Sequence, residues 1–114
     1  MISDLFDRLV RPLRLGPLTR AYPAEPPPLP PSVRGLPELD ISRCDATAAC
    51  TEACPTGALE VAGGTWTLDA GRCIFCGDCA RACPRDALRL GYQVELAARN
   101  RTDLLVVVQL EAPR

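Results

Sequence analysis

The chain has 114 residues, with 13 basic and 14 acidic side chains, no His and seven Cys. This length allows one small domain with extensions. Every basic residue is Arg and the formal charge is -1, which excludes a basic nucleic-acid surface, a Walker A lysine and Schiff-base chemistry. The absence of His excludes His-ligated zinc, Rieske-type centres and His-based acid-base catalysis. The chemistry that remains is that of thiols.

The N-terminal residues do not read as a secretory signal, because Asp4, Asp7 and Arg8 interrupt their apolar run. Seven Cys is also an odd number for a disulfide framework. Both observations predict an intracellular protein whose thiols stay reduced. The longest apolar stretch, residues 104–108, is far shorter than the ~20 residues that a membrane span requires. Any association with a membrane is therefore expected to be peripheral.

Residues 1–15 show the periodicity of an amphipathic helix. Pro12 is expected to disrupt this helix, because proline lacks a backbone N–H and clashes with the preceding turn. The apolar stripe either packs on the chain's own domain or docks on a partner subunit or a membrane surface. Its members are Ile2, Leu5, Phe6, Leu9, Val10 and Leu13.

Residues 16–39 hold most of the chain's 12 prolines. Proline fixes an extended, polyproline-like geometry and removes the donors that a sheet needs. This segment is therefore predicted to contribute neither core nor sheet. We expect a semi-rigid arm that lies over a neighbouring protein.

An internal repeat with an offset of 29 residues occupies much of the remaining chain. It aligns residues 40–44 with 69–73 and residues 50–55 with 79–84, so that Cys falls on Cys in both alignments. Each unit is predicted to contain a Cys-rich loop, a short helix after its Cys-Pro pair and then a short strand. Two such units are expected to stack on each other.

The strand signals of the two units are residues 59–61 and 88–90. Between the units, Gly63 and Gly64 offer a turn into the β-rich residues 65–68. The sequence therefore predicts a hairpin on one side of the domain.

The second unit contains a complete C-x2-C-x2-C-x3-C-P run. Thiolates at this spacing surround one iron-sulfur cube, whereas the fourth Cys of the run ligates the other cluster in two-cluster ferredoxins. We therefore expect one complete 4Fe-4S cluster with thiolates from both units. Its predicted ligands are Cys73, Cys76, Cys79 and Cys54.

A zinc site on four thiolates is the alternative that ligand softness permits. Zinc sites usually pair two C-x2-C knuckles across a long gap, whereas this run places four Cys within eleven residues before a proline. The spacing therefore favours an iron-sulfur cluster over zinc.

The first unit departs from the Cys pattern at Thr47, which the repeat aligns with Cys76. A second cluster would have only Cys44, Cys50 and Cys83 as thiolate ligands, and a threonine hydroxyl is a poor substitute at neutral pH. Four outcomes stay open. The site holds a 3Fe-4S cluster, it holds a 4Fe-4S cluster whose fourth iron binds water, hydroxide or a carboxylate such as Asp45, it takes a ligand from a partner chain, or it is empty.

The two Cys runs resemble a bacterial-type two-cluster ferredoxin domain. The resemblance extends to residues 20–23 and 34–40 of the arm and to residues 54–59 and 73–77 of the Cys runs. Together these segments resemble the polyferredoxin subunits of respiratory complex I and of membrane-bound, energy-converting nickel-iron hydrogenases, including formate hydrogenlyase.

The resemblance implies an α+β fold, namely a ferredoxin-like (βαβ)2 iron-sulfur domain with an N-terminal amphipathic helix and an extended proline-rich arm. It implies a chain that is no enzyme on its own but relays electrons within a membrane-associated oxidoreductase of the hydrogenase or complex I type. Its partners would be a hydrogenase-like or quinone-module subunit and membrane subunits, at the cytoplasmic face of the cell membrane. The alternative is a free-standing soluble ferredoxin, against which the long arms and balanced charge argue.

The C-terminal extension contains two structural signals. Residues 94–99 suggest a helical turn or two, and residues 104–108 suggest a strand. That strand either closes the domain's own sheet or pairs with another subunit. The chain is thus expected to divide into a helix at 1–15, an arm at 16–39, a two-cluster ferredoxin domain at 40–91 and an extension at 92–114.

Overall fold

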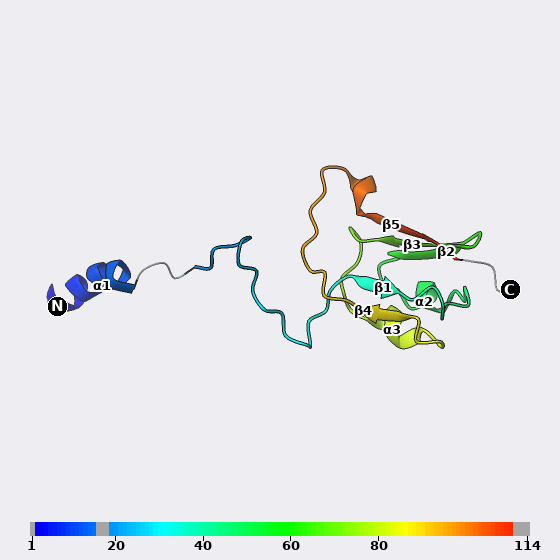
Figure 1. Ribbon diagram of the computed structural model, residues 1–114, viewed down its shortest axis with the longest axis horizontal. Helices are drawn as coiled ribbons and strands as arrows, with labels where there is room; N and C mark the ends of the chain where they lie inside the picture. Colours follow the sequence, from blue (N-terminus) through cyan, green and yellow to red (C-terminus); the bar gives the residue numbers. More distant parts are fainter. Residues whose placement is uncertain (1, 16–18, 111–114) are drawn as a thin grey trace.

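The computed structural model describes residues 2–15 and 19–110 (Figure 1). Residue 1, residues 16–18 and residues 111–114, which belong to the predicted helix, arm and C-terminal extension, lie outside the described part. The described chain mixes short helices with small antiparallel sheets, in agreement with the predicted α+β class. In chain order the elements are α1 (Ile2–Leu15), β1 (Pro37–Leu39), α2 (Ala49–Glu52), β2 (Leu59–Ala62), β3 (Thr65–Asp69), α3 (Asp78–Ala82), β4 (Leu88–Leu90), the 3-10 helix η1 (Arg101–Leu104) and β5 (Leu105–Gln109).

Two small antiparallel sheets form the frame of the domain. In one sheet β1 pairs with β4, and Glu38 lies opposite Arg89. In the other sheet β3 lies between β2 and β5, and Leu59 of β2 lies opposite Leu68 of β3. Each sheet therefore joins a strand of the first unit to a strand of the second, so that neither unit forms its sheets alone.

The backbone reproduces the 29-residue repeat. The N–H of Asp40 donates to the carbonyl of Ala87 at 2.8 Å, and the N–H of Asp69 donates to the carbonyl of Ala58 at 2.7 Å. These bonds are equivalent, because Asp40 and Ala58 of the first unit correspond to Asp69 and Ala87 of the second. The two units therefore stack with an approximate two-fold relation.

The prediction that a short helix follows each Cys-Pro pair is wrong. The helices α2 and α3 precede these pairs, and each carries the third Cys position of its run. Proline disfavours the α-helical backbone conformation of the residue that precedes it. Cys83, which precedes Pro84, is accordingly extended, with ψ 115°. After the prolines the chain turns through Gly57 at φ 61° and Asp86 at φ 49°, directly into a strand.

The helix α1 continues past Pro12 to Leu15, although the sequence predicted a disruption there. A proline removes one backbone hydrogen bond and kinks a helix without having to end it. In Figure 1, α1 stands apart from the domain. The side chains of Ile2 and Leu13 are outside the described part. The exposed large apolar side chains in the described part of α1 are Leu5 at 61%, Phe6 at 64%, Leu9 at 65% and Leu15 at 57%.

The end of the proline-rich arm belongs to the domain, which corrects the expectation that residues 16–39 contribute neither core nor sheet. Leu36 is buried, and β1 follows it. The N–H of Gly35 donates to Gly91 and that of Leu36 to Gln93, at 2.9 and 2.8 Å. Residues 32–36 lie between prolines and keep their backbone donors, so this short gap is able to join a sheet.

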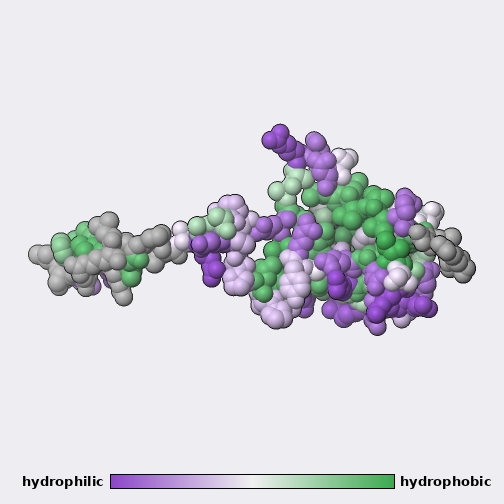
Figure 2. All heavy atoms as spheres, viewed as in Figure 1, coloured by the Kyte–Doolittle hydropathy of each residue, from purple (hydrophilic) through white to green (hydrophobic). Residues whose placement is uncertain are grey.

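The C-terminal extension completes the larger sheet. The strand β5 pairs with β3, with Val108 opposite Trp66, so the predicted strand closes the domain's own sheet. The predicted helical turn at 94–99 is absent, and this segment has neither helix nor strand. Backbone pairing of Gln93 with Leu36 holds the start of the segment extended, which explains the difference. Figure 2 shows hydrophobic side chains gathered over the region of β5 and β3.

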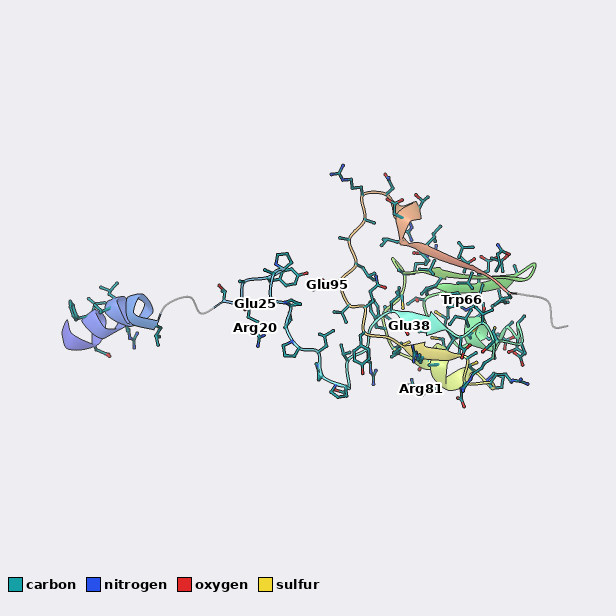
Figure 3. The ribbon with its side chains drawn as sticks, viewed as in Figure 1. Arg20, Glu25, Glu38, Trp66, Arg81 and Glu95 are labelled. Atoms are coloured by element: carbon teal, nitrogen blue, oxygen red, sulfur yellow. The ribbon has the colours of Figure 1, made fainter. Side chains whose placement is uncertain are left out.

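The core lies between the two sheets and the Cys loops. Trp66 and Leu68, on the same face of β3, are 1% and 0% exposed. Figure 3 shows Trp66 on the side of the larger sheet that faces β1. Cys50 and Cys79 belong to the same buried cluster, so the apolar core and the Cys loops form one unit. No helix in residues 2–15 or 19–110 is long and apolar enough to cross a bilayer.

Candidate metal centre

A cavity brings together all four predicted ligands of the complete cluster. Cys54 reaches it from the first unit, and Cys73, Cys76 and Cys79 reach it from the second. Apolar groups line the rest, including Leu59, Leu68, Ile74 and Phe75. The cavity thus brings one Cys of the first unit to three of the second, while their ligation of a cluster stays a prediction.

The loop of the second unit turns twice through the left-handed region. Phe75 has φ 56° and Gly77 has φ 82°, on either side of Cys76. The start of the loop is held by the carbonyl of Asp69, which accepts the N–H of Cys73 at 3.2 Å. Strain of this kind at a non-glycine residue costs of order 1–3 kcal/mol and persists where the surroundings enforce it. Here it directs successive Cys residues toward one cavity.

Arg34 of the arm also supports this loop, which sequence reasoning missed. Its guanidinium donates to the carbonyl of Cys76 at 3.3 Å. The bond joins residues that are 42 positions apart. Only the resemblance of residues 34–40 to known subunits pointed to this part of the arm.

The sulfur of Cys54 accepts hydrogen bonds from its own chain. The N–H of Ala58 donates to it at 3.3 Å, and the Thr56 hydroxyl lies 3.6 Å away. Burial raises the pKa of the Cys54 thiol, but the bonds from Thr56 and Ala58 outweigh burial and leave this pKa below its usual value. Such donors stabilise a sulfur that carries negative charge.

For the two Cys residues deeper in the cavity, burial outweighs the hydrogen bonds. It raises the pKa of the Cys79 thiol to about 11 and also raises the pKa of Cys73. A buried thiolate without a cation is unfavourable, and a bound metal replaces the proton. Four converging thiols in an apolar cavity therefore fit an iron-sulfur cluster, whose iron compensates the thiolate charge.

The other three Cys residues again come from both units, Cys44 and Cys50 from the first and Cys83 from the end of α3 in the second. Cys50 is buried, which raises its pKa, and the proximity of Cys44 and Cys83 raises it further. The N–H of Ala87 donates to the sulfur of Cys83 at 3.3 Å, which repeats the Ala58 bond to Cys54. The predicted second ligand group is thus brought together, while its ligation stays a prediction.

Thr47 lies at the position that corresponds to Cys76. Ala46 before it has φ 59°, close to the 56° of Phe75 before Cys76. The N–H of Thr47 donates to Oδ1 of Asp45 at 3.2 Å. The Thr47 hydroxyl and N–H hold the pKa of the Asp45 carboxyl below its usual value.

Two buried polar atoms in the described residues have no hydrogen-bond partner, the Thr51 hydroxyl and the Trp66 indole N–H. Thr51 follows Cys50, and the repeat aligns it with Ala80. The presence of polar Thr51 where the second unit has Ala80 is visible in the sequence, but Thr51 was not among the predicted site residues. Within the part of the chain that the structure describes, no three His, Cys, Asp or Glu side chains are arranged to hold a single metal ion.

Comparisons with known proteins identify an iron-sulfur domain in the part of the chain that contains the Cys residues. The sequence pattern of the 4Fe-4S dicluster domain family matches residues 43–87. Formate hydrogenlyase subunit 6 of Escherichia coli (strain K12) is 42% identical over 107 residues, which cover 89% of this chain and 59% of that protein. The chain thus spans about three fifths of the curated relative that it matches.

A solved structure supports the same assignment. A chain of the membrane-bound sulfane sulfur reductase, an archaeal respiratory membrane complex, superposes with a TM-score of 0.68 at 30% sequence identity. The match covers 84% of this chain and 55% of that chain. The resemblance that the Cys runs and the arm predicted is therefore confirmed: residues 43–87 have the pattern of a 4Fe-4S dicluster domain, in a chain similar along most of its length to formate hydrogenlyase subunit 6.

Proposed function

We propose that this chain is an electron-transfer subunit, which relays electrons through two iron-sulfur clusters within a membrane-associated oxidoreductase of several subunits. The observation that carries the proposal is the cavity that joins Cys54 of one unit to Cys73, Cys76 and Cys79 of the other. When bound there, a 4Fe-4S cluster accepts and donates one electron at a time. The chain itself is no catalyst in this proposal.

The residues of the cavity hold and tune such a cluster. Leu59, Leu68 and Phe75 keep water from the sulfurs. The N–H of Ala58 stabilises negative charge on the sulfur of Cys54. Burial, hydrogen bonding and charge at this position set the reduction potential.

The two ligand groups meet where α2 and α3 pack on each other. Each helix buries one proposed ligand, Cys50 on α2 and Cys79 on α3. Cys50 and Cys79 belong to the same buried cluster, which supports close proximity of the two groups. This proximity supports passage of an electron from one group to the other through the protein interior.

The exposed stripe of α1 supports a place inside a complex at the cytoplasmic face of a membrane. Leu5, Phe6 and Leu9 are left uncovered by residues 2–15 and 19–110, although burying each of them would stabilise the structure by about 1.5–3 kcal/mol. A partner subunit of hydrogenase or quinone-module type, together with membrane subunits, would supply the missing cover. A freely diffusing ferredoxin has no use for such a helix.

The metal content of the full chain, purified without oxygen, tests the cofactor. We expect about seven or eight irons per chain with matching sulfide, and paramagnetic signals after reduction. Cys54→Ser should remove the signal of the four-Cys cluster, whereas Thr19→Ser in the arm should leave it unchanged. Colourless protein that contains zinc in place of iron would show the proposal to be wrong.

Membrane fractionation tests the place in a complex. The tagged chain, expressed in its native cells, should sediment with membranes in a complex that contains iron-sulfur signals. Replacing Leu5, Phe6 and Leu9 with Ser should release it, whereas Arg8→Ser, at an exposed charged position, should not. If the unaltered chain stays monomeric in the supernatant with both clusters reducible, it is the soluble ferredoxin of the alternative.

A further inference from the structure

The proline-rich arm brings an arginine onto the loop of the four-Cys cavity. Nη1 of Arg34 donates to the carbonyl of Cys76 at 3.3 Å, between residues 42 positions apart. The carbonyl belongs to one of the four Cys residues that line the cavity. A guanidinium stays protonated throughout the physiological pH range. The bond therefore holds a permanent positive charge beside this loop.

The backbone that follows Arg34 is fixed to the domain. The N–H of Gly35 donates to the carbonyl of Gly91 at 2.9 Å, and the N–H of Gly91 donates to the carbonyl of Leu36 at 3.0 Å. A Cβ on Gly35 would lie 2.5 Å from the Gly91 carbonyl oxygen, so this close approach requires glycine. Leu36 is buried, and Pro37 lines the four-Cys cavity itself. The three residues after Arg34 thus hold it against the domain.

The charged side chains that follow Cys76 in the sequence neutralise each other. Asp78 and Arg81, both on α3, form an ion pair. Among the ion pairs formed within residues 2–15 and 19–110, none includes Arg34. Arg34 therefore brings to the Cys76 loop a positive charge that no carboxylate of the described chain cancels.

We propose that Arg34 raises the reduction potential of the four-Cys cluster. The inference rests on the proposed binding of that cluster. Reduction brings one electron and no proton to the site, so the group formed with the four thiolates becomes more negative by one charge. A fixed positive charge beside one of these ligand residues stabilises the more negative state. The arm would thus tune the proposed relay as well as extend from the domain.

A redox titration of the anaerobic full chain with dithionite tests this role through the paramagnetic signal that Cys54→Ser removes. The ratio of reduced to oxidised cluster is compared at the potential that half-reduces the unaltered chain. Arg34→Gln keeps a side-chain donor but loses the charge, and we expect a ratio about tenfold lower, which is a shift of about 59 mV for one electron. Arg34→Lys keeps the charge, so its ratio should change less than about threefold.

Two further variants separate the charge at the loop from other effects. Arg20→Gln is the matched control, because it makes the same change of charge on the same arm. Figure 3 shows Arg20 away from the sheets of the domain, so the ratio should stay the same. Asp78→Asn has the opposite effect, because it leaves the Arg81 charge without its partner and should raise the ratio.

Several results would overturn the inference. An unchanged ratio in Arg34→Gln or in Asp78→Asn would do so, as would equal shifts in Arg34→Gln and Arg34→Lys or in Arg34→Gln and Arg20→Gln. Loss of the four-Cys signal from Arg34→Gln would also overturn it, because Arg34 would then hold the loop and not set a potential. In all these cases the unaltered chain keeps its cluster and the proposed electron transfer stands. An unaltered chain without iron would end both proposals.

Discussion

Replacing Leu68 with Ala tests whether the four-Cys cavity and the apolar core are a single unit. Leu68 is 0% exposed, belongs to the inner face of β3 and lines the cavity that contains Cys54 and Cys73. Its removal therefore perturbs both the packing of the sheet and the shielding of the proposed cluster. We expect lower stability and faster cluster loss together.

The size of the effect follows from the burial of Leu68. Leu and Ala differ by about three carbon groups, and each buried group contributes about 0.8 kcal/mol, so the transfer term is about 2.4 kcal/mol. The cavity that remains raises the total to about 3–5 kcal/mol where the surroundings do not collapse. Since Leu68 packs within the cluster formed by Trp66 and Leu59, we expect a value in this range.

Leu39 provides the control, because the 29-residue repeat relates it to Leu68 and it is only partly buried. Leu39→Ala should cost less than Leu68→Ala. Urea unfolding of the holoprotein, followed by cluster absorbance and by circular dichroism, measures both variants. The two probes should shift together for Leu68→Ala. Equal losses in the two variants, or a structural transition that leaves the absorbance of the four-Cys cluster unchanged, would refute the reasoning.

Three further substitutions test particular contacts, each by the free energy of unfolding in urea. Gly35→Ala should cost about 1–3 kcal/mol, because its Cβ would meet backbone atoms of Gly91 and Gln93. In the control, Gly63→Ala, the Cβ meets no atom and adds only about 1 kcal/mol of strain from the left-handed backbone conformation. Equal losses in the two variants would contradict this expectation. Val108→Asp should lower the free energy of unfolding by more than about 2 kcal/mol, since it places a carboxylate opposite Trp66. Val107→Asp, at an exposed position, should change it by no more than about 0.5 kcal/mol. Asp69→Ala should cost about 1–3 kcal/mol, because this carboxylate is only 17% exposed and accepts the Gly71 N–H at 2.9 Å. Asp40→Ala, at a carboxylate that is 50% exposed, should cost about 1 kcal/mol or less. The reverse order of the two losses would disprove the argument from burial.

The periodic features of the sequence predicted the centre of the fold well. Cys spacing defined the 29-residue offset, and the backbone bonds of Asp40 and Asp69 follow it. The glycine pair at 63 and 64 predicted the hairpin of β2 and β3. These features are local, so their physical cause is contained in a few neighbouring residues.

Features that depend on distant partners were predicted poorly. The strand β1 has only three residues and lies in a proline-rich segment, and it becomes a strand because β4 pairs with it. The order of helix and Cys-Pro pair was wrong, since the restriction that Pro84 imposes on Cys83 was overlooked. Arg34 could not be connected to the Cys76 loop from sequence, because 42 residues separate the bonded groups.

The two units share the backbone bonds of Asp40 and Asp69 but differ near their proposed ligands, and this asymmetry bears on the proposed relay. Thr47 stands where the second unit has Cys76, Thr51 stands where it has Ala80, and Thr56 beside Cys54 corresponds to Arg85. Hydroxyl and charged groups beside a cluster shift the stability of its reduced form. A symmetric pair of clusters would have equal potentials and no preferred site for the electron. If both sites bind a cluster as proposed, the substitutions in the repeat should therefore make one site more reducible than the other.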